Sequence, residues 1–187
     1  VGGTTRLGTL NIVSAGAVTA AALTLAAFDQ DAGTGTTTFN GAVNTNTAAG
    51  VVVANTNLAV NAGVTTTSSG VVTFTQSGTT TIAAAGDISS EGAVTITSTG
   101  GTTTSGDITT TADAIQFASA TTFGGAAALV SANGAVTFSS TLDGAQNLTI
   151  TAGTGLVTFT GAVGGIGRLG TLKIVSAGNV VAAALTL

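Results

Sequence analysis

Two aspartates in matching phrases are the residues of this sequence best suited to chemistry. Asp87 and Asp107 each lie in a Gly-Asp-Ile sequence. If folding places them side by side, one carboxyl group could act as an acid and the other as a base, as in β-helix enzymes that act on polysaccharides. The expectation we favour is structural: a Gly-Asp pair opens a turn, and the carboxylate accepts hydrogen bonds from local backbone amides.

A second acidic pattern is Asp29-Gln30-Asp31-Ala32-Gly33. Two carboxylates separated by one residue could supply oxygen ligands to Ca²⁺, but the remaining ligands of a calcium loop do not follow them. We therefore expect a plain turn here, and Asp29 and Asp31 are kept only as weak candidates for a Ca²⁺ site.

The common catalytic side chains are missing. The sequence has no His and no Cys, and Lys173 is its one lysine. Without an imidazole, a thiolate or a supported lysine, the many Ser and Thr hydroxyls have no base to activate them. The glycine-rich phrases do not open helices after strands, so they do not indicate phosphate binding. The sequence predicts a protein that is not an enzyme and holds no cofactor.

Charge is scarce. Charged residues make up 5% of the 187 residues, whereas soluble globular domains carry about 25%. The cations are Arg6, Arg168 and Lys173, which form no basic stripe, so nucleic acid is excluded as a partner. Rows of identical charges about 4.8 Å apart would repel one another, whereas rows of Thr, Ser and Asn can form hydrogen bonds. Proline, which cannot donate to a strand ladder, is absent.

One stretch is long and uncharged enough to raise the question of a membrane segment. The stretch from Leu7 to Phe28 carries no charged side chain. Its Thr, Gly, Ser and Asn content, and the Lys173 in a later copy of the stretch, argue against insertion into a membrane. An Ala-rich helix at Ala17 to Phe28 is a second alternative, but a β structure is expected there as well.

A short repeat predicts the fold. Apolar-polar-apolar triplets begin at positions 72, 94, 115, 136 and 157. Alternation indicates strands, and a nearly constant step of about 21 residues indicates one coil of a right-handed parallel β-helix, or β-solenoid. The inward residues of these triplets are expected to form a stacked core: Val72, Phe74, Val94, Ile96, Ile115, Phe117, Val136, Phe138, Val157 and Phe159. An immunoglobulin-like sandwich is the all-β alternative, but the Trp or Tyr usual in its core is absent.

A second column and an irregular N-terminal part follow from the same spacing. Ile88, Ile108, Leu129 and Leu148 recur at nearly the same step as the triplets and are expected to stack, with Gly-containing turns between the columns. Upstream of Val72, neither Phe39 nor the run from Val51 to Val53 is expected to fit this spacing without insertions.

A long repeat sets the domain organisation. Residues 1–25 return as residues 163–187, identical at 20 of 25 positions and offset by 162. We therefore assign residues 1–162 as one tandem repeat and 163–187 as the start of the next. Division of 162 by 21 gives roughly eight coils per repeat, on the order of 38 Å long at about 4.8 Å per coil. Open solenoid ends pair with further strands, so either the protein continues in both directions or copies of it associate end to end.

The outward residues of the triplets form candidate contact rows. They are Thr73, Thr75, Thr95, Thr97, Thr137, Ser139, Thr158 and Thr160. A ladder of Thr-x-Thr pairs on a flat face resembles the ice-binding surface of some antifreeze β-solenoids, although Gln116 and Ala118 interrupt it. Threonine is also a common exposed strand residue.

The amino-acid sequences of the repeats resemble those of a known class of proteins. The phrases FTGAVGG (159–165), RLGTLKIVSAG (168–178) and NLTITAG (147–153) are similar to the β-strand repeats of giant bacterial surface and filament proteins, loosely those of filamentous haemagglutinin-type adhesins. The resemblance implies an extracellular or cell-surface rod that serves in a fibre, a sheath or adhesion. The partners expected are other copies of the chain and a cell surface or extracellular matrix. Ice binding and a polysaccharide-active β-helix enzyme are the alternative functions.

Overall fold

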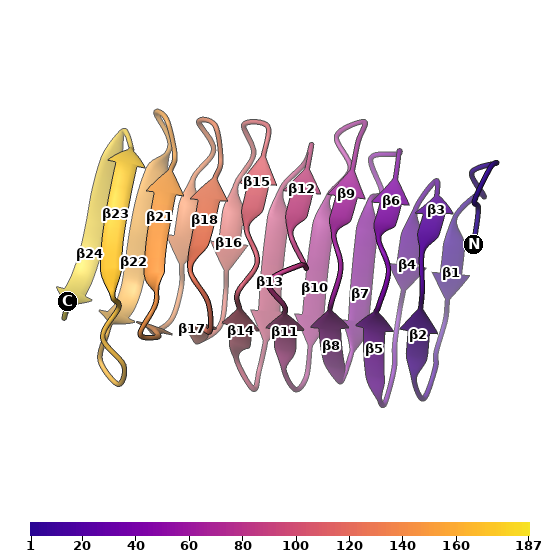
Figure 1. The fold of residues 1–187 in the computed structure, drawn as a ribbon, viewed down its shortest axis with the longest axis horizontal. Helices are drawn as coiled ribbons and strands as arrows, with labels where there is room; N and C mark the ends of the chain where they lie inside the picture. The colour runs from indigo at the N-terminus through magenta and orange to yellow at the C-terminus, as the bar shows by residue number, and fades with distance from the viewer.

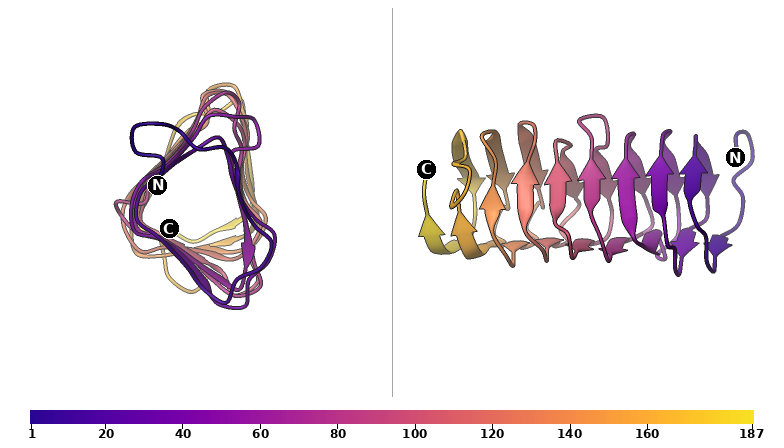
Figure 2. Two further views of the ribbon diagram at one scale, coloured as in Figure 1. Left: turned by 90° about the vertical axis from the view of Figure 1, so that its right-hand side faces the viewer. Right: turned by 90° about the horizontal axis from the view of Figure 1, so that it is seen from below.

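The fold is a β-solenoid with a triangular cross-section. The computed structural model describes all 187 residues, contains no helix and stacks 24 strands in about eight parallel coils. Figure 1 shows the coils side by side from the N-terminus to the C-terminus, and Figure 2 shows the triangular outline along the stack. The predicted parallel β-helix is confirmed, and so is the coil length expected from the triplets.

Each coil contributes one short strand to each of three flat faces. Face one is built from β1 (Leu10–Ile12), β4 (Phe28–Gln30), β7 (Val51–Asn55), β10 (Val72–Gln76), β13 (Val94–Ser98), β16 (Ile115–Phe117), β19 (Val136–Phe138), β22 (Leu156–Val163) and β24 (Asn179–Leu185). Face two is built from β2 (Val18–Ala20), β5 (Thr36–Phe39), β8 (Asn57–Val60), β11 (Thr80–Ile82), β14 (Thr102–Thr104), β17 (Thr121–Phe123) and β20 (Leu142–Asp143). Face three is built from β3 (Leu23–Leu25), β6 (Val43–Thr45), β9 (Val64–Thr66), β12 (Ile88–Ser90), β15 (Ile108–Thr110), β18 (Ala127–Val130), β21 (Asn147–Thr151) and β23 (Thr171–Ser176).

The strands follow from alternation with period two. In the typical triplet Val94-Thr95-Ile96, the outer two residues are buried and the middle one faces outward, because successive side chains of a strand point to opposite sides. Parallel pairing then places like residue above like residue. Val72 pairs with Val94, and Phe74 pairs with Ile96.

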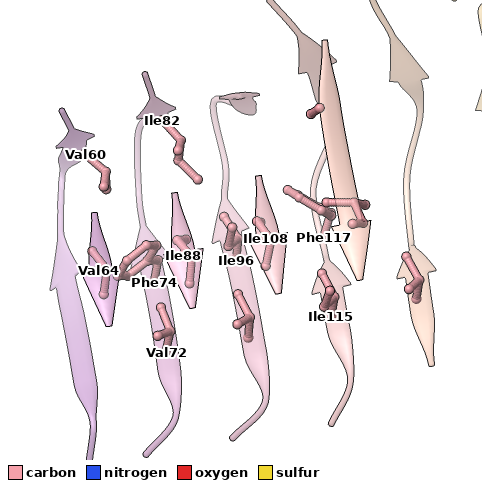
Figure 3. Close-up of a cluster of buried hydrophobic side chains, with 14 of the residues drawn as sticks. Val60, Val64, Val72, Phe74, Ile82, Ile88, Ile96, Ile108, Ile115 and Phe117 are labelled. Atoms are coloured by element: carbon pink, nitrogen blue, oxygen red, sulfur yellow. The ribbon is translucent and has the colours of Figure 1, made fainter. Parts of the chain in front are cut away.

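The interior is a column of apolar side chains that runs the length of the stack. All ten residues of the expected core stack are buried and belong to one cluster of 33 residues, part of which is shown in Figure 3. Phe117, Phe138 and Phe159 lie directly over one another, with ring centroids 5.0 and 5.4 Å apart and interplanar angles of 2° and 7°. In-register pairing imposes this parallel stacking, since the three residues occupy the same position of consecutive coils.

The N-terminal part is more regular than expected. Val51 pairs with Val72 of the next coil, so the run from Val51 to Val53 lies in register with the triplets on face one. The expectation that this run fits the spacing only with insertions is therefore wrong. The apolar residue Val52 at the outward position hides the alternation that marks the other triplets. Phe39 belongs to a different column, on face two, where it pairs with Val60 of the next coil.

Two further expectations need correction. Leu129 pairs with Ile150, and Leu148 pairs with Ala127, so the fourth member of the second column is Ile150. The strand β21 has two inward apolar residues, and spacing alone selected the wrong one. The stretch Ala17 to Phe28 is not helical, since it forms β2 and β3 and reaches β4. The chain contains no helix of the length and apolar character needed to cross a bilayer.

Polar residues line two corners of the triangle inside the stack. At the corner between faces one and two, the buried residues Asn55, Gln76 and Ser98 pair with one another along the coils. Gln30, which pairs with Val53, is a fourth buried polar residue of face one. Gln76 Nε2 donates to the Val53 carbonyl oxygen and to Asn55 Oδ1, and Thr80 Oγ1 lies 2.6 Å from Ser98 Oγ. At the corner between faces three and one, hydroxyls such as that of Ser131 donate to turn carbonyl oxygens. These contacts satisfy polar groups that burial would otherwise leave unpaired.

Candidate functional site

The two aspartates with catalytic potential are on neighbouring coils, and both carboxylates are bound to backbone. Asp107 lies in the coil after Asp87, and both are exposed at the start of strands on face three. Asp87 Oδ1 accepts the backbone N–H of Asp107 at 2.8 Å, and Asp107 Oδ1 accepts the backbone N–H of Ala128 at 2.7 Å. Each carboxylate therefore caps the equivalent position of the following coil, 20 or 21 residues further along the chain, instead of the local amides expected for a Gly-Asp turn.

Other polar side chains cap turns in the same way. Asp143 Oδ1 accepts the backbone N–H groups of Ile166 and Gly167, at 2.8 and 3.1 Å. Asn133 Oδ1 accepts from the backbone N–H of Thr154 at 3.0 Å. Each acceptor lies about one coil before its donor. These side chains join one coil to the next, and no pattern in the sequence separates them from the other Asn and Asp residues.

The weak calcium candidates are placed differently from expectation. Asp29 is in the strand β4 rather than in a turn, with its side chain on the outer surface of face one, where its Oδ2 accepts from Asn11 Nδ2 at 3.3 Å. Asp31 follows the strand and is exposed. The chain has no group of three or more acidic, His or Cys side chains placed so that they could hold a metal ion, so no further carboxylate joins Asp29 and Asp31.

The predicted contact rows lie on the outer surface of face one. Register pairs Thr73 with Thr95 and Thr75 with Thr97, so a Thr-x-Thr array covers two adjacent coils. In the next coil Gln116 replaces the first Thr, and its Nε2 lies 3.4 Å from Ser139 Oγ. The row of Thr73 and Thr95 resumes with Thr137 and Thr158, which pair with each other. Ser139 and Thr160 each lie two positions further along the chain. The two-column array is therefore short.

Face two carries a Thr row that the spacing of apolar triplets does not reveal. Thr81 pairs with Thr103, and Thr103 pairs with Thr122. All three are exposed. The same row begins with Thr19 and Thr38 and is interrupted by Ala59 in the coil before Thr81. The signal was masked because the inward positions of these strands also include threonine, as in Thr102-Thr103-Thr104, so apolar alternation is lost.

Face three has its own polar row. Thr24, Asn44, Thr65, Ser89 and Thr109 occupy consecutive coils at the middle, outward position of its strands. Hydroxyl or amide rows therefore occur on all three faces, interrupted by Val52 on face one, Ala59 on face two and Val130 on face three. No face is singled out by composition. The surface contains no pocket.

The second copy of the repeated segment forms the last coil. Its strands β23 and β24 pair with β21 and β22, so the copy continues the same parallel stack. Apolar side chains of this coil are half exposed, among them Val180 at 43% and Leu185 at 49%. The edge of the last coil is free, since no strand covers β23 or β24 on the far side.

Comparison with known proteins adds no assignment. The chain matches no protein-family model, no curated protein and no solved structure.

Proposed function

We propose that this chain is a structural segment of an extracellular bacterial fibre or adhesin, in which tandem repeats wind one stiff rod. The observation that carries the proposal is the behaviour of the duplicated segment. Residues 163–187 add strands to the stack that residues 1–162 have begun, with parallel pairing of β21 to β23 and of β22 to β24. A further repeat of the same sequence would lengthen the rod without a linker.

The surface supports a mechanical role. The three faces present hydroxyl and amide rows, the surface has no pocket, and the carboxylates of Asp87, Asp107 and Asp143 are bound to backbone amides. A glycoside-cleaving site needs carboxyl groups free to exchange protons on either side of a bound sugar. We therefore favour a rod that is not an enzyme, with other copies of the chain and a cell surface or matrix as its partners.

Ice binding is less well supported than a fibre. The two-column Thr array of face one covers the coils of Thr73 and Thr95 and is interrupted at Gln116. Faces two and three carry polar rows that are a single side chain wide. A purified chain that produced thermal hysteresis, and lost it on Thr95→Leu, would favour ice binding over the structural proposal.

The test of the rod is a length measurement. Chains that contain one, two and three copies of the repeat 1–162 would be compared by small-angle scattering and negative-stain electron microscopy. Each copy is expected to add about 37 Å of length at constant width, because each coil adds about 4.8 Å. Beads joined by flexible linkers, or particles that widen instead of lengthening, would contradict the proposal.

A further inference from the structure

The two copies of the repeated segment lie on different faces of the solenoid. In the first copy, Leu10–Ile12 forms β1 on face one, where it pairs with β4. In the second copy, the corresponding residues Leu172, Lys173 and Ile174 belong to β23 on face three, where they pair with β21. The same sequence has thus moved by one face.

The rest of the segment moves with it. Val18–Ala20 forms β2 on face two, whereas the corresponding residues 180–182 are in β24 on face one and pair with residues 157–159 of β22. Leu23 is on face three, whereas the corresponding Leu185 pairs with Val163, which continues face two. Every strand of the second copy is one face behind its counterpart.

The local structure of the segment is nevertheless kept. The backbone N–H of Thr24 donates to the Val1 carbonyl oxygen at 2.9 Å, and the corresponding bond from Thr186 to Val163 has the same length. Arg6 donates to the Leu25 carbonyl oxygen, and the corresponding Arg168 donates to that of Leu187. The segment has therefore rotated as a unit about the axis of the solenoid.

The cause is the length of the repeat, which is not a whole number of coils. Leu10 and Val157 occupy the same position of face one, seven coils apart. The repeat that starts at Leu10 ends only when the chain has passed through face two and reached Leu172 on face three. One repeat therefore makes seven and two-thirds coils instead of eight.

We propose that consecutive repeats of this chain are related by one-third of a turn, so that a tandem fibre presents every outward row on each of its three sides in succession. The inference rests on the proposed tandem fibre. The partner of the free edge is the next repeat of the same chain. Because Phe28–Gln30 covers β1 in the first copy, the corresponding segment of the following repeat covers β23, on face three.

This rotation determines which outward rows face a binding partner on a given side of the fibre. A row such as the one from Thr73 to Thr158 recurs on the same side only after three repeats, or about 110 Å at about 4.8 Å per coil. Between these positions it appears once on each of the other two sides. Neighbouring fibres or ligands can then engage the same row from three directions, whereas an eight-coil repeat would keep it on one side.

Engineered disulfides test the position of the second copy in the chain as it stands. The protein has no cysteine, so two introduced cysteines give an unambiguous result. Thr149 and Lys173 pair across β21 and β23, and neighbouring strands lie at a Cα separation that a disulfide can span. Thr149→Cys with Lys173→Cys is expected to form a disulfide to completion. The matched control is Thr158→Cys with Lys173→Cys, which would be neighbours only if the second copy occupied the same faces as the first.

The outcomes are distinct. A disulfide in the Thr149 pair with only background oxidation in the Thr158 pair supports the one-third turn. A disulfide in the Thr158 pair would overturn it, and so would failure of both pairs. The pair Thr73→Cys with Thr95→Cys reports on the interior of the stack. If this pair forms while both end pairs fail, only the rotation is wrong, and the rod proposal, which the length measurement tests, is unaffected.

Discussion

The first and second copies of the repeated segment are identical at 20 of 25 positions but have different surroundings. Leu25 is completely buried because further coils cover it, whereas the corresponding Leu187 is 55% exposed at the free end of the stack. The comparison separates two levels of information. Alternation within the segment decides which side chains point inward, and the length of chain wound before it decides which face each strand joins.

Truncation of the equivalent leucines should separate the copies most strongly. Leu25→Ala leaves a cavity in the core and is expected to lower the free energy of unfolding by about 2–5 kcal/mol. Leu187→Ala removes a half-exposed side chain and is expected to cost less than about 0.5 kcal/mol. Urea denaturation followed by circular dichroism measures both. Equal losses would mean that the end coils are not packed as described.

The loop that enters the second copy has a support that the first copy lacks. Asp143 Oδ1 accepts the N–H groups of Ile166 and Gly167, whereas the corresponding residues Thr4 and Thr5 bind no carboxylate. Asp143→Ala should lower the local stability of the second loop by about 1–3 kcal/mol, because hydrogen bonds to charged groups are lost.

Amide hydrogen exchange at Ile166 and Gly167 would show this loss as faster exchange. Asp143→Asn retains an acceptor oxygen and serves as the control, with a smaller effect expected. Unchanged exchange in Asp143→Ala would contradict the role assigned to the carboxylate.

A glycine shared by the two copies tests whether their local structures are the same. Gly2 and Gly164 have φ angles of 72° and 71°, and a Cβ atom on them would overlap the carbonyl oxygens of Thr24 and Thr186. Ala at either position should destabilise its own copy by at least about 1–2 kcal/mol, the cost of the left-handed conformation alone.

Exchange of the Thr24 and Thr186 amides measures the effect, since both donate to the residue before the glycine. Gly165→Ala is the control, because a Cβ there meets its nearest neighbour at 3.5 Å. A large effect in one copy and none in the other would show that the two loops differ.

The smallest effect on stability is expected at the equivalent arginines. Arg6 donates to two carbonyl oxygens, those of Leu25 and Asn44, whereas Arg168 donates only to that of Leu187. Arg6→Ala should cost about 1 kcal/mol, and Arg168→Ala should fall within about 0.5 kcal/mol of the parent. Thermal unfolding of both variants in parallel decides the order, and a larger loss for Arg168→Ala would contradict it.

Much of the architecture could be predicted from the sequence because the spacing of the apolar triplets equals the length of one coil. Face one was identified through Phe74, Ile96 and Phe117, and part of face three through Ile88 and Ile108. Face two was missed because Thr80, Thr102 and Thr121 occupy inward positions there, and threonine gives no signal of its direction. Spacing also cannot decide between two inward residues of one strand, as at Leu148 and Ile150.

The candidate surface was harder to predict than the core. The pairing of Thr73 with Thr95 follows from the triplets, and so does the interruption at Gln116. The bonds of Asp87 and Asp143 to the next coil depend on turn geometry, which the spacing does not contain. The rotation of the second copy was present in the quotient of 162 by 21, but its fractional part has meaning only once three faces per coil are known.

Buried polar side chains distinguish four of the coils from the others. Most inward positions of this solenoid hold Val, Ile, Leu or Phe, which can replace one another. A coil stacked one place out of register would therefore find a nearly equivalent apolar environment. Gln30, Asn55, Gln76 and Ser98 remove that equivalence on four coils, because a displaced amide or hydroxyl would lose its hydrogen-bond partners, at a cost of about 1–3 kcal/mol for each unpaired group. Buried polar side chains can in this way fix the register in which nearly identical coils stack as the chain folds.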